Sequence, residues 1–521
     1  MPGGECLADS NQAPAAPAFI GPSENIQTLT PEQTVFTLSP FEDPDPEDVH
    51  AATELEIWLA PSGALVARVW QAVVEDPAKL TRASLDDGQF EGTATALEPW
   101  TRYAVRARFL DSNGTCSSAG EWSEPLLFRT DDGSAIFFDP ATVFEFELEL
   151  SPETLAAIDA EARPPGCVPF VRDSHPGTLR FQGQEFQNVG VRSKGGCGSA
   201  RRISGKTAFK VNLSWDDPNV PGCPEERRLH GLERFTFNNM VQDRSFIHES
   251  LAYDLYKRMG VPTPRTAYTR LLVNGELWGL YRHVESLDRR FASRWFGSKD
   301  GMLYEGTYRC DLIPANIPPD TDGVYCFSRK FGTGQCSNPT DFVLLADLIN
   351  TLDQVPAGQF YPEVEQYFEY DRFLAMWAVN SVIGHWDGYE QRIINNYRVY
   401  YDETVGRWTV IPTGVDQTYQ TSPPFEVDPF NVSGILASRC LQEPDCEAAF
   451  AAKLRETLAV FEAIDHTQTV QQLRDLIITH VMEDPRKEFD FSQWQGHVDD
   501  TLQFIANRPA RIRQYLSDRG L

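Results

Sequence analysis

The chain has 521 residues, with 46 lysines and arginines against 75 aspartates and glutamates, and therefore a formal net charge of -29. A chain of this length is too long for one ordinary hydrophobic core, so we expect two or more domains. The hydrophobic fraction of 41% is enough to form their cores. The acidic excess argues against nucleic acid and anionic membrane surfaces as partners, because both repel a negative protein. Since no apolar run reaches the roughly 18 residues of a membrane span, we expect a soluble protein that meets basic partners.

The N-terminus and the cysteines bear on the compartment. The first residues, MPGGECLADSNQAPAAPAF, lack the basic and apolar regions of a signal peptide, so none is expected in this chain. The even number of cysteines, without C-x-x-C spacing, favours disulfides in an oxidising compartment over zinc ligands or free buried thiols. We therefore expect an extracytoplasmic protein, secreted or on a cell surface, and the pairing stays open. The cysteines are Cys6, Cys116, Cys167, Cys197, Cys223, Cys310, Cys326, Cys336, Cys440 and Cys446.

Residues 13–131 have the pattern of an all-β sandwich. The runs ELEIWLA, LVARVWQAV and YAVRARFLD alternate in hydrophobicity, and the turn sequences PSG, DDG and DSNG follow them. LEPWTRYAVRARF and EWSEPLLFRT, residues 97–109 and 121–130, resemble the second half of a fibronectin type III domain. The resemblance implies that the hydroxyl of Tyr103 ties a turn to the backbone, and that the module spaces or binds rather than catalyses.

From residue 140 to residue 521 the pattern changes to alternating strands and helices, which predicts an α+β domain. The dipeptide Asn274-Gly275 predicts a type I′ turn that joins TAYTRLLV to ELWGLYRHVE in a hairpin. A second hairpin is expected from NYRVYYD and RWTVIPTGVD. Apolar residues at every second position predict further strands over residues 144–151, 178–195 and 206–213.

Apolar residues at four-residue spacing predict helices in the same region. Ile247, Leu251 and Leu255 define a helix over residues 243–260 that Gly260 ends. Its expected N-cap is Asp243 or Ser245. FVLLADLINTL, DRFLAMWAVNSVIGHW and most of the tail from about residue 446 are also predicted to be helical.

Two acids and an amide flank the second hairpin, although such residues are poor strand formers. Asp387 and Asn396 come before or at its first strand, and Asp416 ends its second. A phosphoryl-transfer site of the protein-kinase type needs an acid to orient the attacking hydroxyl, then an asparagine and a second acid to hold magnesium. The chain order fits, but Asp387 precedes Asn396 by nine positions. Because the ordinary catalytic loop H-R-D-L-x-x-x-N is shorter and is followed by D-F-G, we expect an atypical kinase.

Six segments in consistent order carry a resemblance that runs from about residue 140 to residue 521. They are NVGVRSKGGCGS, KTAFKV, FNNMVQDRSFIHESLAYDL, VNGELWGLYRHVES, NNYRVYY and VIPTGVDQTY. In these segments the chain resembles the CotH-type spore-coat kinases, which have an atypical kinase fold and phosphorylate secreted or surface proteins. The resemblance implies that Lys206 or Lys210 contacts the phosphates of ATP. The resemblance also implies that Asp387 is the catalytic-loop acid and that Asn396 and Asp416 are ligands of Mg2+, with Mn2+ or Ca2+ as alternative metals.

Two glutamates complete the expected nucleotide site. Glu249 lies within an apolar stripe of its predicted helix, where an acid needs a cation, so it pairs either with the strand lysine or in a surface salt bridge. Glu285 follows GLYRHV at the end of the first hairpin, where a kinase hinge would lie. It either binds the nucleotide or caps the next helix.

The expected function is therefore an extracytoplasmic, ATP- and Mg2+-dependent kinase that phosphorylates Ser or Thr of a protein substrate, with basic or Ser-rich segments as expected acceptors. In the last motif, Thr413 and Gly414 replace a W-D pair that the family often carries. The alternative is a catalytically silent, kinase-like coat or surface binding protein. A metal-dependent phosphohydrolase is a third hypothesis.

Overall fold

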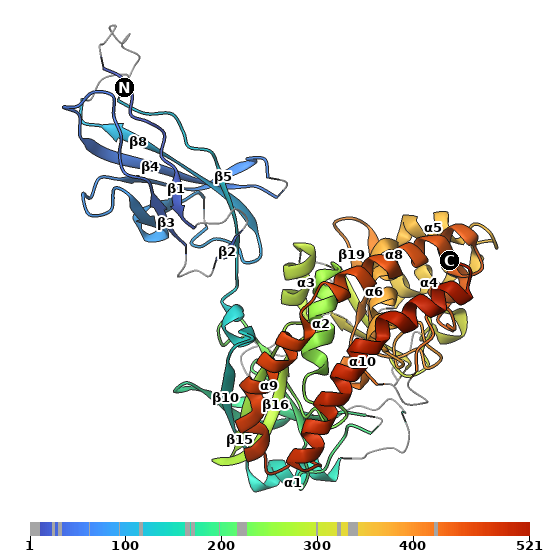
Figure 1. Ribbon diagram of the computed structural model, residues 1–521. Helices are drawn as coiled ribbons and strands as arrows, with labels where there is room; N and C mark the ends of the chain where they lie inside the picture. Colours follow the sequence, from blue (N-terminus) through green and yellow to red (C-terminus); the bar gives the residue numbers. More distant parts are fainter. Residues whose placement is uncertain are drawn as a thin grey trace. The chain divides into compact units, whose positions relative to one another are not determined.

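In the computed structural model the chain divides into two compact units, Met1–Ile136 and Phe137–Leu521 (Figure 1). Strands occur in both units, and the α-helices of the described residues all lie in the second. The structure describes residues 11–22, 27–29, 34–61, 63–92, 94–113, 118–161, 167, 172–196, 198–215, 227–298, 301–319, 325–331, 342–420 and 426–521.

The first unit contains two sheets that share one hydrophobic core. Phe36 comes from the smaller sheet, Trp70 and Val105 come from the larger one, and all three side chains are buried in the same cluster. The smaller sheet is β1 (Phe19–Gly21), β3 (Val35–Leu38) and β6 (Arg82–Ser84). The larger sheet is β2 (Gln27–Leu29), β9 (Leu126–Thr130), β8 (Arg102–Asp111), β4 (His50–Leu59), β5 (Ala67–Val74) and β7 (Gln89–Phe90), in that order.

This arrangement confirms the three strands predicted from alternation, which are β4, β5 and β8. The hydroxyl oxygen of Tyr103 accepts a hydrogen bond from the backbone N–H of Glu98 at 3.0 Å, so this tyrosine does tie a turn to the backbone. The likeness of the unit to fibronectin type III domains stays a prediction.

The second unit begins with a closed barrel. Its strands, in spatial order, are β10 (Val143–Glu149), β11 (His175–Phe181), β12 (Gln184–Lys194), β13 (Ala208–Asn212), β14 (Arg234–Asn238), β16 (Glu276–Val284) and β15 (Thr266–Val273). The β15–β16 hairpin turns at Asn274 and Gly275, whose φ angles of 53° and 78° suit the predicted type I′ turn. Alternation sends Phe209 and Val211 into the barrel, so the neighbouring Lys210 lies on its outer face.

A four-stranded sheet follows the barrel along the chain. Residues 285–288 and the short helix α3 (Arg289–Phe296) connect the two. The sheet order is β18 (Phe327–Phe331), β17 (Gly301–Gly306), β19 (Tyr397–Asp402) and β20 (Arg407–Pro412). Strands β19 and β20 form the second predicted hairpin.

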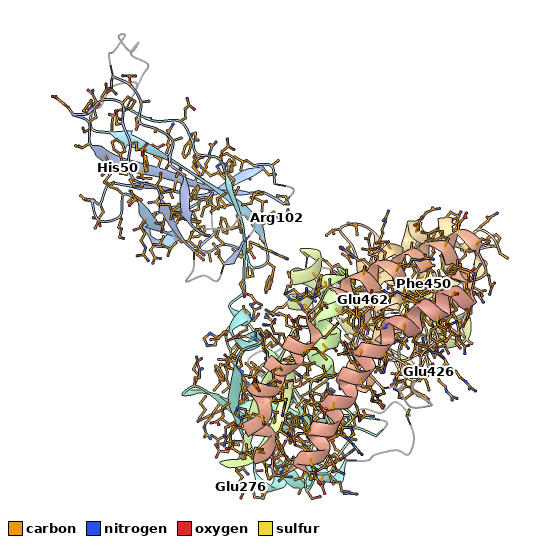
Figure 2. All side chains as sticks on the ribbon, in the orientation of Figure 1. His50, Arg102, Glu276, Glu426, Phe450 and Glu462 are labelled. Carbon is orange, nitrogen blue, oxygen red and sulfur yellow. A yellow bond between two sulfur atoms is a disulfide. The ribbon has the colours of Figure 1, made fainter. Side chains whose placement is uncertain are left out.

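Helices make up most of the remaining chain. Helix α6 is buried along nearly its whole length, and its Trp377 stacks on Phe450 of α8, with ring centroids 3.5 Å apart. Phe450 is labelled on its helix in Figure 2. Figure 1 shows α9 and α10 as long red helices, and α9 contacts β16. The helices are α1 (Pro152–Ala160), α2 (His248–Arg258), α4 (Val343–Gln354), α5 (Phe360–Tyr367), α6 (Tyr370–Ile383), α7 (Ile435–Cys440), α8 (Pro444–Glu462), α9 (His466–Glu483) and α10 (Phe491–Asp518).

Helix α2 begins later than predicted. The sequence predicts a helix from Asp243, but the helix begins at His248 without a side-chain cap. The Asp243 carboxylate instead accepts hydrogen bonds from the backbone N–H groups of Ser245, Phe246 and His248, which bend the chain into a turn. Phe246 adopts a φ of 65° there, which an α-helix does not allow.

The described cysteines confirm the predicted disulfides. Cys310 pairs with Cys326, Cys440 pairs with Cys446, and Cys167 is also disulfide-bonded. The other five predicted participants, Cys6, Cys116, Cys197, Cys223 and Cys336, lie outside the described residues. Of the helices in the described part of the chain, none has the length and apolar character to cross a membrane.

The aromatic barrel core gives a first testable prediction. Phe146 is 1% exposed and packs against the rings of Phe181, Phe235 and Phe237. Phe146→Ala should lower the free energy of unfolding by roughly 3–5 kcal/mol, because it removes the favourable burial of the phenyl ring away from water and leaves a cavity. Calorimetry of the full chain would measure the shift. Val343→Ala, at a side chain that is 66% exposed, is the control and should change stability by less than about 0.5 kcal/mol.

Candidate functional site

Asp387 and Asn396 meet at the loop that joins α6 to β19. Gly384, in the left-handed conformation, ends α6 and turns the chain toward Asp387. The side-chain amide of Asn396 donates to Oδ2 of Asp387 at 2.8 Å, and the amide of Asn395 lies 3.2 Å from both carboxylate oxygens. The nine-residue spacing is therefore a loop folded back on itself, which holds the Asp387 carboxylate between two amides.

Asp416 approaches the same loop from the end of β20. Gly414 has a φ of 61°, and a Cβ atom at this position would lie 2.3 Å from Oδ1 of Asn396. A residue without a side chain is therefore needed for this close approach. Burial, and to a smaller extent the negative charge of Asp416, raise the pKa of Asp387 to about 6, against the hydrogen bonds from Asn395 and Asn396. The structure thus brings together all three residues predicted around the second hairpin.

Glu249 joins this group from helix α2. It is 3% exposed and accepts a hydrogen bond from the side-chain amide of Asn238 at 3.1 Å. Burial, and next the negative charge of Asp416, raise the pKa of Glu249 to about 7, while Arg282 and Lys194 oppose the rise. Among the described residues, Arg282 and Lys194 are therefore the cations that act most strongly on Glu249.

Lys194, which the sequence reasoning missed, is a lysine that acts electrostatically on Asp416 and Glu249. It ends strand β12, and its amino group lies 3.5 Å from Oδ1 of Asn238. Burial raises the pKa of Asp416, and Lys194 is the main group that opposes this rise. A signal was present in the sequence, because Lys194 stands two residues after Arg192 on one strand face and directly before Gly195 and Gly196.

Lys206 lies elsewhere, in a buried ion pair. Its amino group is 2.6 Å from Oδ2 of Asp484, with both side chains at most 1% exposed. The ring of Phe246 lies 4.5 Å from the same amino group, and Asp484 also accepts a hydrogen bond from the backbone N–H of Leu280 at 3.0 Å. The predicted pairing of Glu249 with Lys206 is therefore wrong, because a carboxylate from the distant α9–α10 connection takes this lysine.

Lys210 points toward the four-stranded sheet rather than toward Glu249. It is the cross-strand partner of Arg192, and the acid that acts most strongly on its charge is Glu305 of β17. Burial lowers the pKa of Lys210 well below its usual value, and Glu305 opposes that shift. Neither predicted lysine thus pairs with Glu249, although Lys210 lies beside the site.

Glu285 is held by arginines. Its carboxylate forms ion pairs with Arg265 at 2.8 Å and with Arg294 of α3, and it also accepts from the backbone N–H of Arg265. Burial would raise the pKa of Glu285, but the two arginines lower it overall. These contacts occupy both carboxylate oxygens, so neither predicted role of Glu285, nucleotide ligand or helix cap, is seen.

A buried polar network lies behind the Asp387 loop. Asn380 of α6 donates to Oε2 of Glu390 at 2.6 Å, and Tyr256 of α2 donates to the side-chain oxygen of Asn380. A Cβ atom at Gly388 would lie 2.9 Å from the Asn380 amide. The network therefore joins α2, α6 and the loop that carries Asp387.

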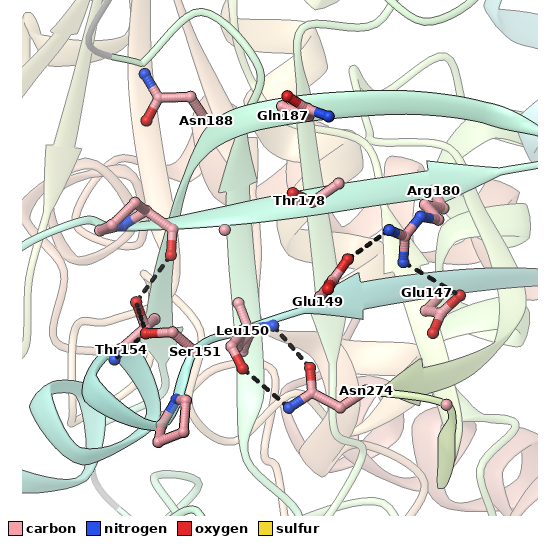
Figure 3. Close-up of a pocket in the computed structure, with 14 residues that line it drawn as sticks. Glu147, Glu149, Leu150, Ser151, Thr154, Thr178, Arg180, Gln187, Asn188 and Asn274 are labelled. Atoms are coloured by element: carbon pink, nitrogen blue, oxygen red, sulfur yellow. Dashed lines mark hydrogen bonds and ion pairs between the residues drawn. The ribbon is translucent and has the colours of Figure 1, made fainter.

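A hollow of about 780 Å3 lies away from this group, on the outside of the barrel (Figure 3). Its lining includes Glu149, Arg180, Asn188 and Asn274. Asn274 donates to and accepts from the backbone of Leu150, so its side chain is fully used in the fold. None of the predicted site residues lines this hollow.

The chemistry of the acid group suits a divalent cation with a phosphate ligand. Asp387, Asp416 and Oδ1 of Asn396 present oxygen atoms of the kind that Mg2+ prefers. The amide nitrogen of Asn396 is already bonded to Asp387, which leaves Oδ1 as its donor atom for a metal. A cation here would stabilise the charged form of acids whose pKa is raised by burial and by the charge of Asp416.

Comparison with known proteins places residues 191–512 in the family described as CotH kinase protein. The inner spore coat protein H of Bacillus subtilis (strain 168) is 22% identical over 302 residues, 56% of this chain and 81% of that protein. Invasin CotH2 of Rhizopus delemar is 23% identical over 333 residues, 59% of this chain and 53% of that protein. The Helicobacter pylori proinflammatory kinase CtkA overlaps 67% of this chain and 95% of its own, at 10% identity and a TM-score of 0.23, which is too low to support an argument about fold.

The buried ion pair predicts a large effect of Lys206 on stability. Lys206→Met should lower the free energy of unfolding by roughly 3–5 kcal/mol, because it leaves a buried carboxylate without its cation. Calorimetric unfolding of the full chain would measure the loss. Arg258→Met, which breaks the exposed pair with Asp254, is the control and should cost less than about 1 kcal/mol. Equal effects of the two changes would contradict the structural role of Lys206.

Glu390 predicts a pH-dependent stability. Burial raises its pKa from 4.5 to about 7, so the folded state is penalised when the group ionises. Glu390→Gln should therefore stabilise the protein at pH 8 by up to about 3 kcal/mol. This gain in the free energy of unfolding should shrink toward zero as the pH falls through 7 toward 4.5 and below, because the Glu390 carboxyl of the unchanged protein is then protonated in both the folded and the unfolded state. Melting curves across this range would test the prediction, with Glu276→Gln, at an exposed glutamate, as the control.

Proposed function

We propose that this chain, which belongs to the CotH kinase protein family, transfers the γ-phosphoryl group of ATP to a hydroxyl group of a protein in the presence of Mg2+. The observation that carries the proposal is the convergence of Asp387, Asn396 and Asp416 beside Glu249 and Lys194. These are the parts that kinase-type phosphoryl transfer requires, supplied by a barrel, a helix, a loop and a strand end.

Asp387 is proposed to orient the acceptor hydroxyl and take its proton. Asn395 and Asn396 fix the direction of its carboxylate, and their hydrogen bonds favour the charged form that can accept a proton. With a pKa raised to about 6, the carboxyl is mostly ionised at neutral pH while staying a stronger base than an ordinary aspartate.

Asn396, through Oδ1, and Asp416 would hold the metal. When bound, Mg2+ would neutralise part of the phosphate charge that builds up during transfer. Lys194 is proposed to contact the phosphates in place of Lys206, since its amino group lies beside Asn238 and acts on both Glu249 and Asp416. Glu249 and Asn238 would keep this lysine in position.

The setting of the reaction is proposed to be outside the cytoplasm. The disulfides at Cys310–Cys326 and Cys440–Cys446 fit an oxidising compartment. Relatives carry the names spore coat protein and invasin, which fit surface locations. The proposed acceptors are Ser or Thr hydroxyls in basic or Ser-rich segments, since the chain carries a net charge of -29. The first unit would serve as a placement module.

Phosphate transfer from γ-labelled ATP to a basic, Ser-rich protein acceptor tests the proposal. Asp387→Asn should lower the rate by about 10²–10⁴-fold, because the hydroxyl loses its base. Asp416→Asn should also abolish most transfer, since the metal loses a carboxylate ligand. Asp499→Asn, at an exposed helix position, is the control and should leave the rate unchanged. Transfer that stays strong in both site variants would overturn the proposal.

A thermal shift with ATP and Mg2+ separates the kinase from its alternative. A folded chain that is stabilised by the nucleotide but transfers no phosphate to any acceptor would indicate a catalytically silent binding protein. Release of phosphate without an acceptor, at the full rate, would indicate a phosphohydrolase.

A further inference from the structure

The first turn of helix α2 contacts the backbone of Asp416. His248 is the first residue of α2, and its side chain belongs to a residue that is 6% exposed. Nδ1 of its ring lies 3.0 Å from the backbone carbonyl oxygen of Asp416, 168 residues further along the chain. The next residue, Glu249, interacts electrostatically with the Asp416 carboxyl. Two successive residues of α2 therefore interact with the same acid, one through its backbone and one through its side chain.

The partners of His248 assign a hydrogen atom to Nδ1. Besides the carbonyl oxygen of Asp416, Oδ1 of Asp243 lies 3.3 Å from this nitrogen. A carbonyl oxygen and a carboxylate oxygen both accept hydrogen bonds, so Nδ1 has to be the donor. The histidine ring thus donates to the Asp416 backbone.

Thr501 of helix α10 holds the other side of the ring. Its Oγ1 lies 3.0 Å from Nε2 of His248, and the threonine is 1% exposed. The same hydroxyl donates to the carbonyl oxygen of His497 in α10, which fixes its direction. Helices α2 and α10, both labelled in Figure 1, are linked through this ring. Since both ring nitrogens have partners, the ring cannot turn without losing a hydrogen bond.

The carbonyl group of Asp416 lies beyond the strand ladder that orders its neighbours. The ladder between β19 and β20 ends at Pro412. Asp416 follows in the short 3-10 turn Val415–Gln417. A hydrogen bond to a carbonyl oxygen fixes the plane of that peptide group, and the side chain leaves the backbone at the adjacent Cα atom. The bond from His248 therefore sets the direction of the Asp416 carboxylate.

We propose that His248 is a positioning residue of the site, whose Nδ1–H fixes the backbone of Asp416 and thereby the carboxylate that is proposed to hold Mg2+. The inference rests on the proposed function in one respect, that Asp416 is a ligand of the metal. Groups that orient a metal ligand commonly change metal affinity by about 10–100-fold when they are lost. A histidine that only fills space between α2 and α10 would instead affect stability and leave metal affinity unchanged.

Two uncharged replacements separate these roles. His248→Asn keeps an amide N–H near the position of Nδ1, whereas His248→Gln places it near the position of Nε2. Neither can carry a positive charge, so any electrostatic effect of the histidine on Asp416 is lost equally in both.

The binding of Mn2+ to the full chain would be measured by electron paramagnetic resonance, with adenylyl imidodiphosphate as a nucleotide that does not transfer its phosphate. Mn2+ affinity should fall at least about tenfold in His248→Gln. It should stay close to that of the unchanged protein in His248→Asn, because the donor to the Asp416 carbonyl group is retained.

Thr457→Val is the control for a loss of stability. Thr457 is 0% exposed, and its hydroxyl donates to the carbonyl oxygen of Lys453 in α8, the same helical bond that Thr501 makes in α10. The change should lower the melting temperature and leave Mn2+ affinity unchanged. Melting curves without metal would show that every variant is folded under the conditions of the titration.

Asp416→Asn distinguishes a failure of this inference from a failure of the proposed function. Mn2+ binding that is weakened by Asp416→Asn but not by His248→Gln would overturn the role of His248 and leave the proposed metal site standing. Mn2+ binding that Asp416→Asn leaves unchanged would overturn both. An equal loss of affinity in His248→Gln and His248→Asn would also contradict the inference, because the Nδ1–H would then make no difference.

Nuclear magnetic resonance of the unchanged protein, labelled with nitrogen-15 in its histidines, gives a second measurement that does not depend on the folding of His248→Gln. The signals of His248 are those missing from His248→Asn. They should show a hydrogen on Nδ1 and shift when Mg2+ and adenylyl imidodiphosphate are added together. Ring signals that show no hydrogen on Nδ1, or that do not respond to the metal and nucleotide, would overturn the inference.

Discussion

The burial of three acids, Asp387, Asp416 and Glu249, is the constraint on which the proposed site depends. Burial raises the pKa of each, and Asp416 adds to the rise at both neighbours. Amide donors offset part of this cost, because Asn395 and Asn396 donate to Asp387 and Asn238 donates to Glu249. The hydrogen-bond donors of this site thus hold acids close to one another. Such a site suits a ligand that brings positive charge, as a metal-bound phosphate would.

The C-terminal helices belong to the architecture of this site, although none of the acids comes from them. The α9–α10 connection supplies Asp484 to Lys206, and its Arg486 donates to the carbonyl groups of Ile203 and Gly205. Helix α10 adds a hydrogen bond from Trp494 to the carbonyl group of Ser245, in the turn that precedes α2. The segment before β13 and the start of α2 are thus both fixed by the end of the chain.

Cations and acids lie close together in this part of the second unit. Arg192 and Lys210 are cross-strand partners in the barrel, and Lys194 acts electrostatically on both Lys210 and Asp416. The chain as a whole is acidic, with a net charge of -29, so these neighbouring cations are a local feature that composition does not reveal.

Much of the secondary structure and the chain order of the site residues could be predicted from the sequence alone, because they depend on local interactions. The Asn274-Gly275 hairpin, the strands around Phe209, and the order of Asp387, Asn396 and Asp416 were all predictable, because turn conformation, alternation and chain order depend on near neighbours. The start of α2 was not, since the carboxylate of Asp243 forms a turn that competes with capping.

Only the tertiary structure decided which lysine acts on the acids Asp416 and Glu249. Lys194, Lys206 and Lys210 all lie within two neighbouring strands and the segment between them, and alternation cannot rank them. The choice depends on partners far along the chain: Asp484, 278 residues from Lys206, withdraws that lysine into a buried ion pair. Glu305 faces Lys210, and Asp416 is left to Lys194. Electrostatic pairing acts through space, so a lysine's role is set by the fold that brings distant acids to it.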